Sequence, residues 1–111
     1  MSHSGACHCG DVTVSIAHDP VEAFECNCSI CRRTGALWTY APPATVAVAG
    51  ECDGYKQGDE ALTLWRCKRC GIVTHWTPTD PAHDRMGINL RNFDPALWAG
   101  LPRTHVDGAS W

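Results

Sequence analysis

With 111 residues the chain has room for one hydrophobic core, which predicts a single domain over residues 1–111. Its 10 glycines and 7 prolines favour short elements over long helices. The formal net charge of −3 argues against binding to the phosphate backbone of nucleic acid. No apolar run approaches the roughly 18 residues that cross a membrane, and the N-terminus lacks a secretory signal pattern, so we expect a soluble, cytoplasmic protein.

The first part of the chain predicts two short strands. Residues 11–16 alternate polar and apolar side chains, which predicts a strand with Val12, Val14 and Ile16 facing inward. A second strand is expected over 21–26, after a turn marked by an Asp-Pro pair. This second strand leads directly into a group of cysteines.

The next stretch predicts one helical turn followed by two strands. The turn is expected over 29–34, with Ser29 as its N-terminal cap and Gly35 as its end. Strands over 37–40 and 45–48 follow, each bounded by proline or glycine.

The second half predicts a hairpin, a strand and a further helical turn. Strands over 62–65 and 72–76 flank a Cys-Lys-Arg-Cys turn, which predicts a β-hairpin with a zinc knuckle at its tip. Residues 85–90 alternate again, with the apolar side chains Met86, Ile88 and Leu90 on one face. A helical turn begins with Asp94 as cap and Pro95 in the first position. The fold class is therefore mainly β, with zinc-knuckle hairpins and short helical turns.

Seven of the 8 cysteines fall into three tight clusters: Cys7 and Cys9; Cys26, Cys28 and Cys31; Cys67 and Cys70. The first and last clusters each end in glycine, which permits the sharp turn of a zinc knuckle. Zinc prefers thiolates in tetrahedral sites. Four cysteines from the two glycine-terminated pairs make one closed site, and the other three make a site with an open fourth position. Closed sites stabilise folds, whereas open sites bind or activate a ligand.

Other groupings and other cysteine chemistry are weaker interpretations. The central cluster could instead join Cys67 and Cys70, but the matching glycine-terminated pairs favour the first grouping. A disulfide framework is disfavoured, because we expect a reducing compartment and because cysteines one residue apart bridge poorly. A thioredoxin-like role for Cys67 and Cys70 is disfavoured as well, because a strand rather than a helix follows them.

Several residues are candidates for a fourth ligand of the three-cysteine site. Cys52 is the remaining thiol, although a small apolar filler is its more ordinary role. The histidines that qualify in principle are His8, His75, His83 and His105. A lone histidine near a strand is more often a surface or satisfied core residue than a ligand.

Basic and aromatic residues adjoin the three-cysteine cluster. Arg32 and Arg33 can hold a substrate carboxylate through charge-assisted hydrogen bonds, or can simply offset the charge of the thiolates. Trp38 and Tyr40 follow closely and are candidates for the wall of a substrate pocket, although most tryptophans in so small a chain are expected to be core. No general base is assigned.

The three clusters, in order and within their neighbouring residues, resemble those of the glutathione-dependent formaldehyde-activating enzyme family, also called the GFA or CENP-V domain. The matching stretches are 5–12, 26–35 and 67–71, and the resemblance extends to Asn89, Asp107-Gly108 and Trp111 near the end. It covers nearly the whole chain, which is noticeably shorter than the glutathione-using members.

The resemblance implies a β-tent fold and two zinc ions. Cys7, Cys9, Cys67 and Cys70 match the family's structural zinc site, and Cys26, Cys28 and Cys31 match its second, more labile zinc. The implied activity is the addition of glutathione to formaldehyde to give S-hydroxymethylglutathione, which is a carbon–sulfur lyase reaction in its reverse sense.

Two functions are therefore consistent with the sequence. The first is a zinc-dependent carbon–sulfur lyase acting on the adduct of a small-molecule thiol, such as glutathione, with a small aldehyde. The second is a non-enzymatic zinc module that binds a protein partner. Fold alone does not separate them.

Overall fold

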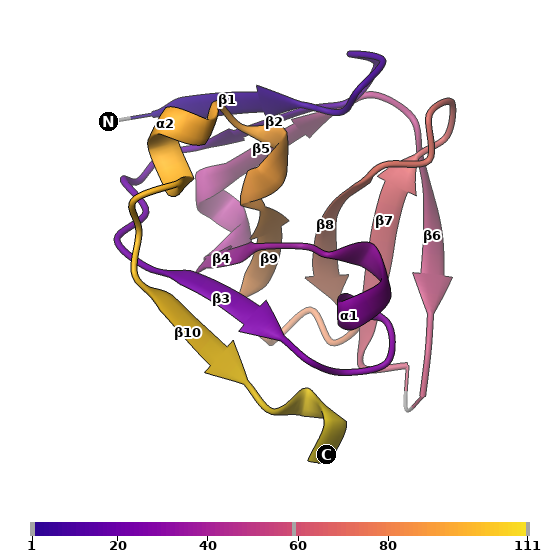
Figure 1. The fold of residues 1–111 in the computed structure, drawn as a ribbon. Coiled ribbons are helices and arrows are strands. Elements are labelled where there is room, and N and C mark those ends of the chain that lie inside the picture. The colour runs from indigo at the N-terminus through magenta and orange to yellow at the C-terminus, as the bar shows by residue number, and fades with distance from the viewer. Residues whose placement is uncertain (1, 59, 111) are drawn as a thin grey trace.

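The structure, a computed structural model, describes residues 2–58 and 60–110. These residues form two sheets and a few short helices, which confirms the mainly-β prediction (Figure 1). The smaller sheet has the order β1 (His3–Ala6), β2 (Thr13–Ile16), β5 (Val46–Ala49). The larger sheet has the order β10 (Arg103–Val106), β3 (Ala23–Cys26), β4 (Trp38–Ala41), β9 (Met86–Asn89), β8 (Val73–Pro78), β7 (Leu62–Cys67), β6 (Cys52–Lys56).

The helices are single turns that join or follow strands. The α-helices are α1 (Cys31–Thr34) and α2 (Pro95–Trp98), and the 3-10 turns are Pro43–Thr45, Leu90–Asn92 and Gly108–Ser110. No helix within residues 2–58 and 60–110 is long and apolar enough to cross a membrane. Trp111 lies outside the described residues.

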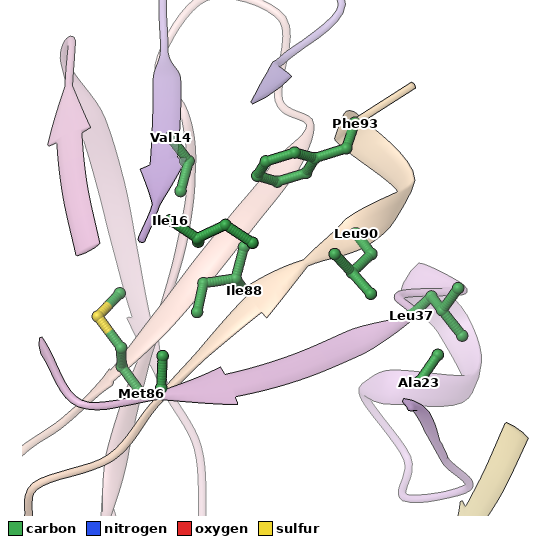
Figure 2. Close-up of a cluster of buried hydrophobic side chains, with 9 residues drawn as sticks. Val14, Ile16, Ala23, Leu37, Met86, Ile88, Leu90 and Phe93 are labelled. Carbon is green, nitrogen blue, oxygen red and sulfur yellow. The ribbon is translucent and has the colours of Figure 1, made fainter. Parts of the chain in front are cut away.

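The main core lies between the smaller sheet and one face of strands β3, β4 and β9 (Figure 2). Val14 and Ile16 enter it from β2, as the alternating pattern predicted, and are 2% and 1% exposed. Met86 and Ile88 of β9 and the following Leu90 reach it from the larger sheet, also as predicted. The two sheets are therefore joined by apolar side chains that the sequence pattern had assigned to inward faces.

The opposite face of the larger sheet carries a second, aromatic cluster. Side chains alternate along β4, so Ala41 packs into the main core while Trp38 and Tyr40 point to the other face. Trp76 of β8 lies on this face across from Gly87 of β9, where any side chain would overlap the indole ring. This aromatic face lies next to the three-cysteine cluster, because Cys31 packs against it.

The N-terminal cap of the first helical turn was predicted wrongly. The capping position of α1 is Ile30, and no side chain caps the turn. The N–H of Cys31 instead donates to the sulfur of Cys28 at 3.4 Å, so a thiol takes the place that Ser29 was expected to fill. Gly35 does end the turn, with φ 68° in the left-handed region. At α2 the predicted cap and the predicted first residue are both confirmed. Asp94 accepts a hydrogen bond from the N–H of Ala96, and Pro95 begins the helix.

A buried histidine makes stability depend on pH. His75 of β8 is 5% exposed, and burial lowers its pKa to about 4, below the ordinary value of roughly 6.5. Between these values the unfolded chain binds a proton that the folded protein does not, so stability falls as pH falls. We expect His75→Gln to remove a slope of about 1.4 kcal/mol per pH unit between pH 6.5 and 4.

Urea unfolding of both proteins at several pH values measures that slope. The thiols titrate in both proteins, so their contribution cancels in the difference, and the values at pH 8 give the baseline. Parallel stability curves for the two proteins would show that folding does not lower the pKa of His75.

Candidate metal centres

Four sulfurs from distant parts of the chain meet at one end of the sheets. The Sγ atoms of Cys7, Cys9, Cys67 and Cys70 all lie within 4.8 Å of one another. The Cys9 sulfur is 3.7 Å from that of Cys7 and 3.5 Å from that of Cys67, well beyond the length of a disulfide bond. Four sulfurs bound tetrahedrally at about 2.3 Å from zinc would be about 3.8 Å apart. The spacing therefore fits one metal ion.

The two glycine-terminated loops that supply these sulfurs have similar backbone hydrogen bonds, although the glycine lies three residues after the first cysteine in one loop and four in the other. In each loop the N–H of the first cysteine donates to the carbonyl five residues later, and the N–H of the glycine donates back to the carbonyl of that cysteine. The pairs are Cys7–Val12 at 3.0 Å, Gly10–Cys7 at 3.0 Å, Cys67–Ile72 at 2.9 Å and Gly71–Cys67 at 3.0 Å. Gly10 and Gly71 have φ of 84° and 78°, which favours glycine. The glycine-closed turn that the sequence predicts after each cysteine pair thus occurs twice.

Backbone N–H groups point at the sulfurs. The N–H of Val12 donates to the sulfur of Cys7 at 3.3 Å, and those of Arg69 and Cys70 donate to the sulfur of Cys67 at 3.4 Å each. Such contacts favour the thiolate over the thiol. The loops are therefore organised to hold negative sulfurs.

The four thiols differ in their tendency to ionise. Backbone N–H groups at Cys9 and Ile72 lower the pKa of Cys70 to about 6. The Asp11 N–H favours the Cys9 thiolate, but burial and the neighbouring thiols outweigh it and raise the pKa of Cys9 to about 12. Like charges this close cannot all ionise unless a cation offsets them. The donor set thus fits a divalent metal that prefers sulfur.

Basic side chains around this group are already paired with acids. Lys68 lies 3.8 Å from Glu51, and Arg69 lies 3.7 Å from Asp11. All four side chains line a shallow surface pocket together with Gly50. Their charges therefore balance one another on the outer surface.

The remaining thiol lies beside the four-sulfur group without joining it. Cys52 is the register partner of Cys67 in the neighbouring strand and packs against the same apolar cluster. Burial raises the pKa of the Cys52 thiol, as expected for a small apolar filler. Within residues 2–58 and 60–110 no histidine belongs to either sulfur group. The alternative grouping of Cys67 and Cys70 with the central cluster does not occur either.

The other three sulfurs form a separate, local group. Cys26 ends β3, Cys28 lies in the connecting turn, and Cys31 begins α1, with their Sγ atoms within 4.8 Å of one another. Burial raises the pKa of Cys31 to about 12 with help from the Cys28 thiol. Burial also opposes ionisation of Cys28, but the Cys31 N–H and the neighbouring thiols together lower the pKa of Cys28. The lowered pKa of Cys28 and the raised pKa of Cys31 make Cys28 the more readily ionised of these two thiols.

The C-terminal segment clamps this local group, a feature that sequence reasoning did not identify. The Asn27 side chain donates to Asp107 at 2.9 Å and accepts from the N–H of Ala109 at 2.9 Å. The Asn27 N–H donates to the carbonyl of Val106 at 3.1 Å. Gly108 lies so close to Cys26 that an added Cβ would be 2.6 Å from its sulfur. The only sequence signal was the family resemblance of Asp107-Gly108.

The aromatic and basic residues that the sequence suggested for substrate binding differ in their exposure to solvent. Trp38 is 2% exposed and packs beneath Cys31, whereas Tyr40 is half-buried. Arg32 and Arg33 lie exposed on α1, and the Arg33 guanidinium donates to the carbonyl of Ser29 at 2.6 Å. Tyr40 is thus the more accessible of the two aromatic candidates.

Comparisons with known proteins agree with this geometry. A family model described as "Glutathione-dependent formaldehyde-activating enzyme" matches residues 2–106. The crystal structure of a Rhodobacter sphaeroides protein is similar to this chain with 30% sequence identity and a TM-score of 0.74. The match covers 91% of this chain and 99% of that one. The chain therefore belongs to the glutathione-dependent formaldehyde-activating enzyme family.

Proposed function

We propose that this protein is a zinc-dependent carbon–sulfur lyase acting on the adduct of a thiol with a small aldehyde, as an S-(hydroxymethyl)glutathione synthase does. The observation that carries the proposal is the local group of Cys26, Cys28 and Cys31, which offers three sulfurs and, within the described residues, no fourth ligand. Membership of a glutathione-linked family supports a small-molecule thiol as the partner.

The two sulfur groups would have different tasks. Cys7, Cys9, Cys67 and Cys70 would hold a structural zinc ion, because four thiolates complete a tetrahedral site. Cys26, Cys28 and Cys31 would hold a second zinc ion with one position free. A zinc ion in such a site supplies a place where a thiol binds as its thiolate, or polarises a carbonyl oxygen.

The reaction itself needs little beyond positioning. The thiol sulfur bonds to the carbonyl carbon, the C=O π electrons move to oxygen, and the proton lost by the thiol ends on that oxygen. A free thiol is mostly protonated at neutral pH, since its pKa is about 8.5. The chain's contribution would be to hold the thiol as thiolate beside Cys26, Cys28 and Cys31, with Tyr40 and its aromatic neighbours covering one side of the substrate.

The two metals should differ in stability. The four-sulfur group is closed and joins distant segments, whereas the three-sulfur group is local and partly exposed. We expect graded chelation, followed by metal analysis, to release one equivalent of zinc well before the second. A stoichiometry of one zinc in freshly purified, reduced protein would contradict the three-sulfur site.

Hemithioacetal formation tests the activity directly. The zinc-loaded protein should accelerate the reaction of formaldehyde with glutathione and other thiols, and Cys28→Ser should abolish that acceleration while the protein stays folded. Metal-free buffer and Cys28→Ser carrying one zinc are the matched controls. No acceleration with any thiol, in protein carrying both metals, would exclude the lyase and leave the protein-binding zinc module.

A further inference from the structure

Arg85 is held on the aromatic face beside the three-sulfur group. Its guanidinium carbon lies 4.0 Å from the centroid of the Tyr40 ring, which is the geometry of a cation–π contact. The side chain is exposed and forms no ion pair within residues 2–58 and 60–110. By contrast, Arg69 and Arg103 are paired with carboxylates. The Tyr40 ring thus orients the Arg85 guanidinium, and no carboxylate within the described residues neutralises its charge.

The ring beneath Arg85 is itself held in place. Tyr40 lies between Phe24, at a centroid distance of 4.8 Å, and Trp76, at 6.1 Å. Trp76 in turn occupies the space that the missing side chain of Gly87 leaves open. Three strands, β3, β4 and β8, therefore supply a continuous aromatic support for one guanidinium.

This support borders the three-sulfur group. Cys31 belongs to the same apolar cluster as Tyr40 and Phe24. Burial raises the pKa of Tyr40, the charge of Arg85 opposes the shift, and charges on Cys26 and Cys31 add to it. Tyr40 therefore lies within electrostatic range of both the Arg85 guanidinium and the sulfurs of Cys26 and Cys31.

We propose that Arg85 binds a carboxylate of the substrate thiol and so determines which thiols the protein accepts. This inference rests on the proposed function. A guanidinium presents a planar set of N–H donors that matches a carboxylate, and it does so best when its plane is fixed. A thiol whose sulfur lies at the three-sulfur group would run its carbon chain along the edge of the Tyr40 ring, since Arg85 covers the ring face, and would bring its carboxylate to Arg85. A carboxylate separated from the sulfur by one or two residue lengths of extended chain lies roughly 4–7 Å away, which is enough to pass the edge of one aromatic ring.

Two other roles for basic residues make different predictions. If Arg85 only offsets the negative charge of the sulfurs, its removal should weaken the binding of every thiol equally. If α1 holds the carboxylate instead, replacing Arg32 should weaken the binding of the thiols that carry a carboxylate. Arg33 is the weaker alternative, since the Ser29 carbonyl already occupies its guanidinium.

The test measures thiol binding to full-length protein in which cobalt replaces zinc. Thiolate-to-cobalt absorption reports each change in sulfur ligation. The protein is titrated with 3-mercaptopropionate, which carries a carboxylate, with glutathione, and with uncharged 2-mercaptoethanol. The variants are Arg85→Gln, Arg85→Lys and Arg32→Gln, of which the last tests the alternative role of α1, and each is first shown to have wild-type cobalt absorption and melting temperature.

Arg85→Gln should weaken the binding of 3-mercaptopropionate and of glutathione about tenfold and leave the binding of 2-mercaptoethanol unchanged. Arg85→Lys should recover part of the loss, and Arg32→Gln should match the wild type. Equal weakening of all three thiols by Arg85→Gln would overturn the inference while the lyase proposal stands, as would a selective loss in Arg32→Gln. No spectral response of the wild type to any thiol would overturn the lyase proposal and this inference together.

Discussion

Replacing Cys67 with serine should unfold the protein or prevent its soluble expression, whereas replacing Cys28 should leave it folded. Cys67 ends β7, and its sulfur lies 3.5 Å from that of Cys9, 58 residues away in the chain. A structural zinc contributes on the order of 10 kcal/mol of binding free energy to folding, as much as the whole stability of many domains. Circular dichroism and thermal melting of the purified proteins measure the effect.

Cys28 should be far less important to the fold, because its group closes only a short loop. Cys26, Cys28 and Cys31 lie within six residues, and the main core between the two sheets does not include them. Cys52→Ser is a second control, since Cys52 packs beside the four-sulfur group without belonging to it. Equal destabilisation by the Cys67 and Cys28 changes would mean that the structural site has been assigned to the wrong group.

Local patterns allowed much of this fold to be predicted. The alternation of apolar residues identified β2 and β9, because each of these strands buries one of its two faces in the main core. The glycine after each cysteine pair identified both knuckles, because positive φ at Gly10 and Gly71 closes those turns. These features depend on neighbours in sequence, so they can be read without the structure.

Three strands were not predicted, because their pairing rather than their composition makes them strands. β1 contains Gly5, β6 contains Gly54 next to an aspartate, and β10 lies at the sheet edge. β10 pairs in parallel with β3, a contact between residues about 80 positions apart. No local alternation of side chains marks such a strand, since only its partner defines it.

The residues around the three-sulfur group show the same difference between local and long-range signals. Arg32 and Arg33 were chosen because they follow the cysteines in sequence, whereas Arg85 reaches Tyr40 only through the pairing of β4 with β9. The clamp on Asn27 likewise comes from the far end of the chain. Sequence proximity identified the sulfur donors, but the residues around them are assembled by the sheet.

Gly108→Ala should weaken metal binding by the three-sulfur group about 10- to 100-fold without lowering the stability of the fold. A Cβ at this position would lie 2.6 Å from the Cys26 sulfur and 3.1 Å from the Cβ of Cys28. The Cys26 side chain can relieve the overlap by rotating about χ1, since its sulfur is the end of a short, flexible chain. That rotation would carry the sulfur away from Cys28 and Cys31. Chelator competition followed by metal analysis measures the loss, and thermal melting measures the fold.

Gly100→Ala is the matched control, because a Cβ added at Gly100 meets no atom within 4 Å. Neither Gly100 nor Gly108 has the positive φ that would make alanine unfavourable for the backbone itself, so the two changes differ only in what the new methyl group meets. Weak metal binding in both variants, or melting of the fold in Gly108→Ala, would contradict a local steric effect. Selective loss in Gly108→Ala would mean that the C-terminal segment sets the position of Cys26. The C-terminal segment would then support the three-sulfur group in two ways. It hydrogen-bonds Asn27, and its Gly108 leaves room for the Cys26 sulfur.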